Sequence, residues 1–392
     1  MYIEKQSMSM TEKPGIAIIG GGPGGLMLAR LLHMAGFAAT VFERDESAQF
    51  RPQGGTLDIH ENTGQQALAQ AGLLSAFKRF ARYDDQGGRL CDKHGRLLLD
   101  DPGQPEDNRP EIDRTALRDL LLASLPKGMV RWGQAVASIS PTKEGAFRVH
   151  TQNGPVADYD LVIGADGAWS RVRPLLSAYQ PHYSGLTFIE FGIDDVDASH
   201  PEIAGFVGRG KLGAEGDGRA IIIQRNANAH LRGYAIFRVP ENWASEQFAN
   251  LSPAARRERL VAEFPGWSPR LTDMIRVAND HIVPRLIYAL PVGHHWQNRP
   301  GLTLLGDAAH VMSPFGGNGV NEALFDAAEL ARHIVSADDW RDGVKTYETE
   351  MFARVSLPAR EAHDAAATEL SHLGLELTQA VMESHRAEAA LT

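Results

Sequence analysis

The chain has 392 residues, a formal net charge of −10 and 43% hydrophobic residues. This length suits two globular domains, and the acidic balance argues against nucleic acid as a partner. The single cysteine, Cys91, excludes an intramolecular disulfide and a thiolate zinc cluster. No apolar run reaches the roughly 18 residues of a membrane span, and no H-E-x-x-H pattern occurs. We therefore expect a cytoplasmic monomer without a metal site.

A glycine-rich turn follows the first apolar segment. Residues 16–19 predict a buried strand, and the apolar stretch over residues 26–32 predicts a helix. The turn between them has the G-x-G-x-x-G spacing that lets backbone approach a pyrophosphate at a helix N-terminus. Its glycines are Gly20, Gly22 and Gly25. Glu43 ends a second predicted strand, where a carboxylate accepts hydrogen bonds from ribose hydroxyls and disfavours a 2′-phosphate. This half-site suits FAD or NAD rather than NADP.

A second segment, late in the chain, favours FAD over NAD. Residues 302–305 predict another buried strand, Gly306 and Asp307 open a loop, and a helix is expected from Val320 to about Val335. FAD extends across a fold, so it needs a group for its ribityl hydroxyls and a glycine-rich backbone beside its flavin ring. Asp307 and the loop over residues 316–319 meet those two needs.

The remaining pattern predicts an α/β fold whose domains interleave. The expected FAD-binding domain comprises residues 14–85, 108–178 and 282–340, including a helix with Asp113 as its N-cap. The expected substrate domain comprises residues 86–107 and 179–281, where short alternating runs predict antiparallel strands with one helix near residues 252–264. Residues 341–392 predict a C-terminal helical segment that packs on the two domains or bridges them. A substrate cavity is expected between the domains.

Three motifs occur in a specific order: the glycine turn, Asp166–Gly167 at the end of a buried strand, and Gly306–Asp307. In this order they resemble the class A flavin monooxygenases of the para-hydroxybenzoate hydroxylase fold. Residues 51–60, 110–114 and 314–321 are similar to the tetracycline-inactivating members of that group. The resemblance implies a Rossmann-type FAD-binding domain interleaved with an antiparallel β-sheet substrate domain.

The resemblance also implies roles for individual residues at the cofactor. Glu43 and Arg44 would hold the adenosine end of FAD, and Arg51 would lie near the path of NADPH and the flavin. Asp166 would shape both the flavin site and the nicotinamide approach. The full set expected to bind cofactor is Gly20, Gly22, Gly25, Glu43, Arg44, Arg51, Asp58, Arg114, Asp166, Asp307, Gly317, Gly319, Val320 and Asn321.

On the substrate side, the resemblance places Glu190, Lys211 and Arg232 where the tetracycline enzymes use glutamine, arginine and histidine. The inner wall of the pocket would be formed by Pro314, Phe315 and Gly317. An ionised Glu190 in a partly dry cavity requires a cation, and the expected partner is Lys211 or else a cationic group on the ligand. The altered residues imply a substrate preference that differs from tetracycline.

The resemblance implies an FAD-dependent monooxygenase that takes electrons from NADPH or NADH. Through a flavin hydroperoxide it would add one oxygen atom of O₂ to a polyoxygenated aromatic or polycyclic substrate, with tetracycline-type antibiotics as the named candidate. The flavin carries this chemistry, so no catalytic side chain is expected. Two alternatives remain open: a flavin oxidase or dehydrogenase on the same scaffold, and a flavin-binding regulatory module without turnover.

Overall fold

A five-stranded parallel sheet forms the centre of one lobe of the molecule, in the order β17-β11-β1-β2-β7. The computed structural model describes residues 13–50, 54–104, 107–368, 370–371 and 374–389. The strands of this sheet are β1 (Ile16–Ile19), β2 (Ala39–Phe42), β7 (Val130–Arg131), β11 (Leu161–Gly164) and β17 (Leu302–Leu304). The residues of β1, β11 and β17 are buried, as expected for parallel strands covered by helices.

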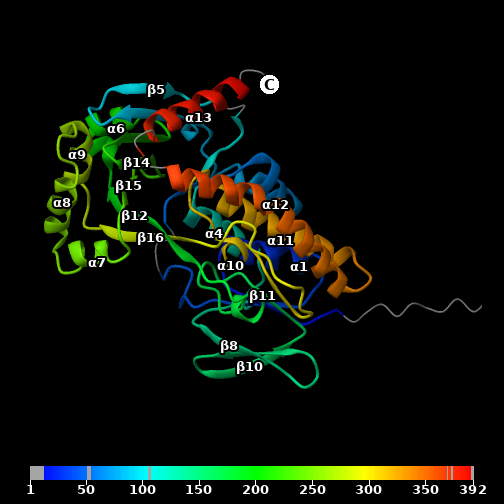
Figure 1. The fold of residues 1–392 in the computed structure, drawn as a ribbon. Helices are drawn as coiled ribbons and strands as arrows, with labels where there is room; N and C mark the ends of the chain where they lie inside the picture. Colours follow the sequence, from blue (N-terminus) through cyan, green and yellow to red (C-terminus); the bar gives the residue numbers. More distant parts are fainter. Residues whose placement is uncertain (1–12, 51–53, 105–106, 369, 372–373, 390–392) are drawn as a thin grey trace, which may run out of the picture.

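Helices pack around this sheet to form one continuous hydrophobic core (Figure 1). They are α1 (Pro23–Met34), α2 (Gln66–Gln70), α3 (Leu74–Phe77), α4 (Arg114–Ala123), α10 (Asp307–His310) and α11 (Asn318–Ser336). Short helical turns occupy Glu61–Gln65, Tyr83–Asp85 and Arg173–Leu175. Helix α1 lies close against α11, because Gly24 has no side chain there: a Cβ on it would lie 3.0 Å from the carbonyl oxygen of Ala323 on α11.

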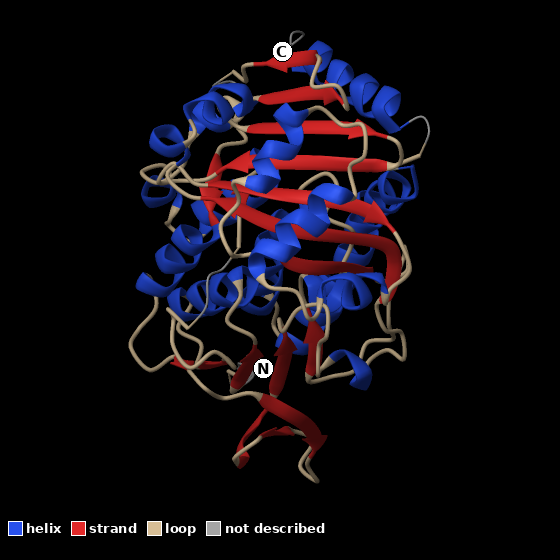
Figure 2. Ribbon diagram, turned by 90° about the vertical axis from the view of Figure 1, so that its left-hand side faces the viewer, coloured by secondary structure: helices blue, strands red, loops and turns tan. Residues whose placement is uncertain are grey.

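A larger, seven-stranded sheet forms the second lobe, in the order β16-β12-β15-β14-β13-β4-β5 (Figure 2). Its strands are β4 (Gly88–Asp92), β5 (Leu97–Asp101), β12 (His182–Ile193), β13 (Lys211–Gly216), β14 (Arg219–Arg225), β15 (Leu231–Arg238) and β16 (Val283–Ala289). Alternate residues point to opposite faces. Ile189 and Phe191 therefore enter a core with the helices of this lobe, whereas Phe188 and Glu190 lie on the opposite face. The helices are α5 (Val196–Ser199), α6 (Pro201–Val207), α7 (Trp243–Phe248), α8 (Pro253–Ala262) and α9 (Pro269–Arg276).

Two small sheets and two C-terminal helices complete the described chain. Strands β3 (Thr56–Asp58) and β6 (Glu111–Asp113) form an antiparallel pair, and β8 (Val136–Pro141), β9 (Phe147–Thr151) and β10 (Gly154–Tyr159) form a three-stranded sheet at one end of the molecule. Helix α12 (Trp340–Thr368) packs on α11. Helix α13 (Gly374–Ala389) packs on β13, where Thr378 Oγ1 donates to Glu215 Oε1 at 2.7 Å. Among the described residues, none of the helices combines the length and the apolarity that crossing a membrane requires.

The expected α/β fold, with a parallel sheet beside a mainly antiparallel one, is confirmed. One local expectation was wrong. Between residues 179 and 281 the chain forms five helices rather than one, because helices of 4 to 10 residues are too short to show a clear period. Asp113 is the N-cap residue of α4, as predicted, but its carboxylate pairs with Arg82 at 2.8 Å and accepts from the backbone of Ala227 instead of bonding to the first turn of the helix.

Candidate cofactor and substrate site

The glycine turn at the end of β1 is shaped by close backbone approaches. Gly20 has φ of +111°, and a Cβ on it would lie 2.8 Å from the Cα of Asp166. A Cβ on Gly25 would overlap the Gly20 carbonyl oxygen, whereas a Cβ on Gly22 would have no atom of the described residues within 4 Å. The turn leads into α1, whose N-terminus carries unpaired N–H groups. The turn therefore leaves a backbone surface open for a phosphate.

Glu43 ties this turn to the end of β2. Its buried carboxylate accepts from Gly21 N at 2.7 Å and from Asp45 N at 2.9 Å. Arg44 is exposed beside it. The carboxylate thus sits at the strand end where the sequence predicted a ribose partner, and its protein contacts hold it there.

Asp166 follows β11, next to the same turn. Its Oδ2 accepts from Arg171 N at 2.7 Å, and its Oδ1 is buried without a hydrogen-bond partner among the residues that the structure describes. Burial raises the pKa of this carboxyl, and the hydrogen bonds to Ser170 and Arg171 only partly oppose that effect. A buried carboxylate oxygen without a partner is costly, so it indicates a position for a hydroxyl donor from a ligand.

Asp307 begins α10, close to the N-terminal turn of α11. Burial raises the pKa of its carboxyl, and the charges of His310, Arg114 and Arg173 only partly offset this increase. The side chain is nevertheless exposed to solvent. Enclosure by protein together with solvent access indicates a recess in the surface. A Cβ on Gly319 would lie 3.9 Å from Asp307 Oδ1, so the Gly-Asp turn and the glycine loop line the same recess.

The glycine loop is anchored to β3 by Asn321. Asn321 Oδ1 accepts from His60 N at 2.8 Å, and its Nδ2 donates to the Asp58 carbonyl at 2.9 Å. Gly317 has φ of +68°, and a Cβ there would lie 2.6 Å from Asp58 Oδ1. Val320 is half-buried and packs on the core of the first lobe. These contacts bring Asp58 directly against the loop that the sequence predicted to lie beside a flavin ring.

Asp58 is itself surrounded by cations. It pairs with Arg109 at 2.7 Å and with His60 Nε2 at 3.1 Å. Burial raises its pKa, but the hydrogen bond and charge of His60, with the charges of Arg109 and Lys211, hold it well below the usual range. These neighbours therefore favour the ionised form of Asp58 at this end of the recess.

Arg114 and two glycines mark the place where the lobes meet. Arg114 is exposed at the start of α4, and a Cβ on Gly54 would lie 3.2 Å from its Cδ. A Cβ on Gly55 would lie 3.1 Å from Arg232 Cδ and 3.2 Å from Tyr234 Oη. Arg51, expected near the NADPH path, lies outside the described residues.

The face of the large sheet opposite its helices carries the expected substrate residues. Lys211, Gln224 and Arg232 stand side by side on β13, β14 and β15. Phe315 lies against this face, with its ring centroid 6.0 Å from that of Phe188, whereas Pro314 is exposed. The glycine loop and the sheet thus form two walls of one site.

The expected partner of Glu190 was wrong. Glu190 is ion-paired with Arg232 and, at 3.0 Å, with Arg285 Nε, and it lies 2.9 Å from His281 Nε2. Burial raises its pKa, but the bonds and charges of Arg285, Arg232 and His281 lower it below the usual range. The positive charge of Lys211 instead helps to lower the pKa of Asp58. The sequence could not anticipate Arg285 and His281, because β16 reaches β12 only after nearly a hundred residues.

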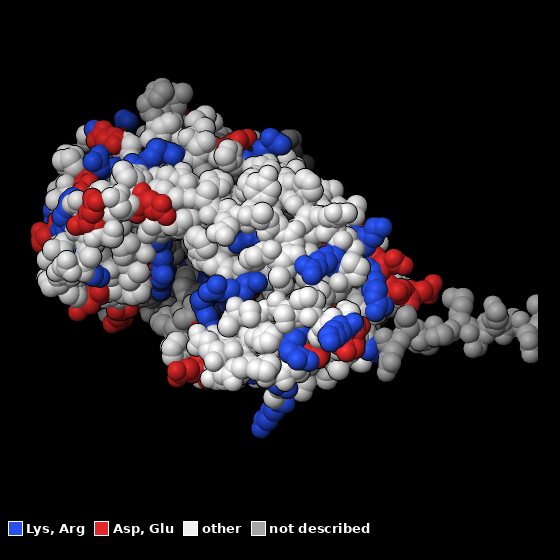
Figure 3. Space-filling model, turned by 60° about the horizontal axis from the view of Figure 1, so that its bottom comes forward, with Lys and Arg blue, Asp and Glu red and all other residues white. Residues whose placement is uncertain are grey.

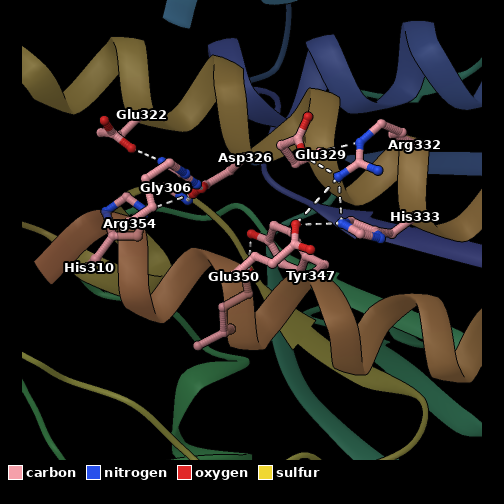
Figure 4. A network of polar contacts seen from close by, with 11 residues as sticks. Gly306, His310, Glu322, Asp326, Glu329, Arg332, His333, Tyr347, Glu350 and Arg354 are labelled. Atoms are coloured by element: carbon pink, nitrogen blue, oxygen red, sulfur yellow. Dashed lines mark hydrogen bonds and ion pairs between the residues drawn. The ribbon is translucent and has the colours of Figure 1, made fainter.

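A polar network behind the Gly-Asp turn was also missed (Figure 4). Asp326 on α11 is fully buried and accepts from Gly306 N at 2.8 Å and from His310 Nε2 at 2.6 Å. Arg354 on α12 pairs with both Asp326 and Glu322. The network fixes the turn that presents Asp307.

A second polar group joins α11 to α12 further along (Figure 4). Carboxylate and ring atoms of Glu329, His333 and Glu350 lie within 4.8 Å of one another, a spacing compatible with a metal ion. The Arg332 guanidinium lies among them, 2.5 Å from Glu329 Oε2 and 2.7 Å from His333 Nε2. Because this cation already offsets the carboxylates, we interpret the group as an ion-pair clamp between the helices.

Comparison with known proteins identifies the family. A family model described as an FAD binding domain matches residues 14–249 and 292–360. "Monooxygenase penA" from Penicillium thymicola is 32% identical over 374 residues, which span 83% of this chain and 86% of the relative. The chain belongs to the FAD binding domain family and is an FAD-dependent monooxygenase. The open glycine turn, the unpartnered Asp166 oxygen and the recess at Asp307 fit the cofactor.

Solved structures confirm the fold of the class A flavin monooxygenases. Klebsiella pneumoniae HpxO, complexed with FAD and uric acid, aligns with a TM-score of 0.79 at 21% identity, covering 95% of this chain and 93% of that one. The tetracycline destructase Tet(51) aligns with a TM-score of 0.74 at 20% identity, covering 97% of each chain. At these identities the likeness concerns the fold alone.

Proposed function

We propose that the protein uses NADPH or NADH to reduce bound FAD and adds one oxygen atom of O₂ to an anionic, polyoxygenated aromatic or polycyclic substrate. The proposed substrate class rests on one observation: a row of cationic side chains on the face of the large sheet that lies opposite the glycine loop. Arg232 and Arg285 share the single carboxylate of Glu190, and Lys211 stands on the same face. In the space-filling view, Lys and Arg side chains gather around the hollow between the lobes (Figure 3).

The residues that would hold FAD come from both ends of the chain. The glycine turn and Glu43 would take the pyrophosphate and adenosine end, with Arg44 at its edge. Asp166 and Asp307 would accept from hydroxyls of the cofactor, and the loop at Gly317 with Asp58 and Arg114 would border the ring. Bound FAD would accept a hydride and react with O₂.

The protein's own contribution is orientation and charge. Phe315, which packs on the buried Phe188, offers apolar ring surface, while Tyr234 is half-buried beside Gly55. A flat ring placed against Phe315 and Tyr234 would lie within reach of Arg232, which favours an ionised phenol, enol or carboxylate. Pro314 and Gly317 would complete the inner wall.

The domain arrangement supports this assignment. We propose that residues 14–85, 108–178 and 282–340 act as the FAD-binding unit and residues 86–107 and 179–281 as the substrate unit. Helix α13 rests on the substrate sheet, and the Met382 side chain lies near Gly88 and Lys211. The C-terminal segment would thus bridge the units and close one side of the substrate face.

Tetracycline is a weaker candidate than a smaller anionic aromatic. Glu190 is a carboxylate already bound to two guanidiniums, so it cannot act as the neutral amide of the tetracycline enzymes. We expect tetracycline to be bound or turned over slowly, and Glu190→Gln to increase its turnover because the amide can both donate and accept.

The deciding experiment supplies NADPH or NADH, ¹⁸O₂ and a panel of phenols, aromatic acids and tetracycline to the FAD-loaded protein. A product that gains one ¹⁸O atom supports the monooxygenase. Hydrogen peroxide without labelled product would identify an oxidase, and the absence of nicotinamide oxidation would favour a regulatory module. Arg285→Gln, compared with the matched surface variant Arg276→Gln, should selectively weaken turnover of anionic substrates.

A further inference from the structure

Two carboxyl groups face each other across the small sheet formed by β3 and β6. Asp58 is directly opposite Glu111, so both side chains lie on one face of the sheet. Asp58 is held ionised by Arg109 and His60. Because a second negative charge directly opposite would be repelled, Glu111 is the member of the pair that favours a proton.

Thr56 can form a hydrogen bond with Glu111 whether Glu111 is ionised or protonated. Its Oγ1 lies 2.6 Å from Glu111 Oε2 and 3.3 Å from the Ile112 carbonyl, and it accepts from Arg82 Nη2 at 3.0 Å. When Glu111 is ionised, the hydroxyl donates to it. When Glu111 is protonated, the acid donates to Thr56 and the hydroxyl turns to Ile112. Because the heavy atoms need not move, Glu111 can be protonated and deprotonated without a rearrangement of Thr56.

The surroundings of Glu111 balance its two forms near neutral pH. Burial raises the pKa of Glu111 to about 7. The hydrogen bond of Thr56 lowers it, the charge of Asp58 raises it, and the charges of Lys211 and Arg82 lower it. These groups come from β3, β13 and the segment before Tyr83. Glu111 is buried, whereas the Asp58 side chain opposite it is 22% exposed, so water reaches the pair from the Asp58 side.

We propose that Glu111 holds the proton that each turnover consumes and releases it toward the space between Asp58, the Gly317 loop and Lys211. The proposal rests on the proposed function, in which RH, O₂, NAD(P)H and H⁺ give ROH, H₂O and NAD(P)⁺. The hydride supplies two electrons and the oxidised carbon supplies two. The Glu111 O–H bond breaks, its proton ends in the water formed, and solvent restores the acid.

The protonation of Glu111 can be measured without turnover. Infrared difference spectra of the apoprotein between acid and mildly alkaline pH should show the C=O band of a carboxylic acid that disappears near pH 7. This band should be absent in Glu111→Gln. It should remain in Glu215→Gln, a matched control that removes another buried, threonine-bonded carboxyl, on β13 of the seven-stranded sheet. A spectrum of Glu111→Gln identical to that of the parent would overturn the proposal.

Turnover then tests whether this proton is used. In the parent, the rate should fall above about pH 7 as Glu111 ionises. Glu111→Gln should bind FAD normally, lose at least tenfold in rate and lose that pH dependence. Thr56→Val, which removes a bond that lowers the pKa, should move the fall to higher pH and provides a second test if Glu111→Gln does not fold.

The two proposals fail in distinguishable ways. If labelled oxygen enters the product but Glu111→Gln keeps the parent's rate and pH profile, the role of Glu111 is wrong and the monooxygenase stands. If no labelled product forms from any substrate, the proposed function is wrong, and Glu111 has no reaction for which to supply a proton.

Discussion

Asp307 illustrates how one residue can be enclosed by protein and still available to a ligand. Its carboxyl lies in a recess bordered by the glycine loop of α11, where burial raises its pKa. A hydroxyl donor in this recess would favour the ionised form. The same argument applies to Asp166, whose buried Oδ1 has no hydrogen-bond partner in the described part of the chain. Both positions therefore become more favourable when FAD is bound.

Asp307→Ala should weaken FAD binding by on the order of 1.5 to 3 kcal/mol, or about tenfold or more, because a hydrogen bond to a charged group is lost. Titration of the apoprotein with FAD, followed by flavin fluorescence, measures the effect. Asp307→Asn is the control, since an amide can still accept from a hydroxyl. Unchanged affinity in Asp307→Ala would remove this residue from the cofactor site.

Glu111 should make stability depend on pH. Its pKa is raised from 4.5 to about 7 in the folded protein, so between these values the folded state binds more protons than the unfolded chain. Stability from this group is full below pH 4.5 and is lost as the pH rises through 7. As the pH rises from about 5 to about 8, the free energy of unfolding of Glu111→Gln should increase by up to about 3 kcal/mol relative to that of the parent. Urea unfolding of the two apoproteins measures this difference. If the difference in unfolding free energy between Glu111→Gln and the parent does not change with pH across this range, the pKa of Glu111 is not raised.

At the scale of elements, helices α11 and α12 hold the Gly-Asp turn in place. Asp326 on α11 binds Gly306 and His310, and Arg354 on α12 neutralises it. Glu348, six residues before Arg354 on α12, accepts from Trp296 and from Thr303 on β17. The pair of helices therefore links the sheet core to the cofactor recess.

Arg354→Met should destabilise the protein by about 3 to 5 kcal/mol, because Asp326 and Glu322 would remain buried without a counter-ion. FAD affinity should also fall, since Asp326 would no longer be held at Gly306. Arg332→Met removes the half-exposed cation of the neighbouring clamp and should change stability by only about 0 to 1 kcal/mol. Thermal unfolding of both apoproteins measures this contrast, and equal losses would contradict the role of Arg354.

For the whole molecule, the substrate face is the surface where the two lobes and the C-terminal helix meet. Helix α13 rests on β13 through Thr378 and Glu215, beside the row that contains Lys211. Each lobe has its own hydrophobic core, whereas Lys and Arg side chains gather around the hollow between the lobes (Figure 3). Binding of substrate should therefore depend on the C-terminal segment, and binding of FAD should not.

Truncation after residue 373, which removes α13, should leave FAD content unchanged and weaken substrate binding severalfold, because one side of the face is uncovered. Truncation after residue 389 keeps α13 and serves as the control. Substrate-induced changes in the flavin spectrum give the dissociation constants. Equal affinity in the two truncated proteins would show that α13 only packs on the sheet.

The sequence by itself determined the parts of the site that depend on local backbone geometry. The turn at Gly20 and the Gly306–Asp307 segment were recognisable because close backbone approach permits only glycine and because the flanking apolar runs predict buried strands. The fold class followed from those strands, and the Asp58 and Asn321 segments followed from resemblance.

Only the tertiary structure decided which charged groups meet. Glu190 pairs with Arg285 rather than Lys211, Asp326 with Arg354, and Asp58 faces Glu111. Each pair joins residues that are far apart in the chain or on separate strands, and no local period encodes such a contact. The pKa of a carboxyl depends on burial and on these neighbours, so the chemistry of Glu111 could not be read from its position in the sequence.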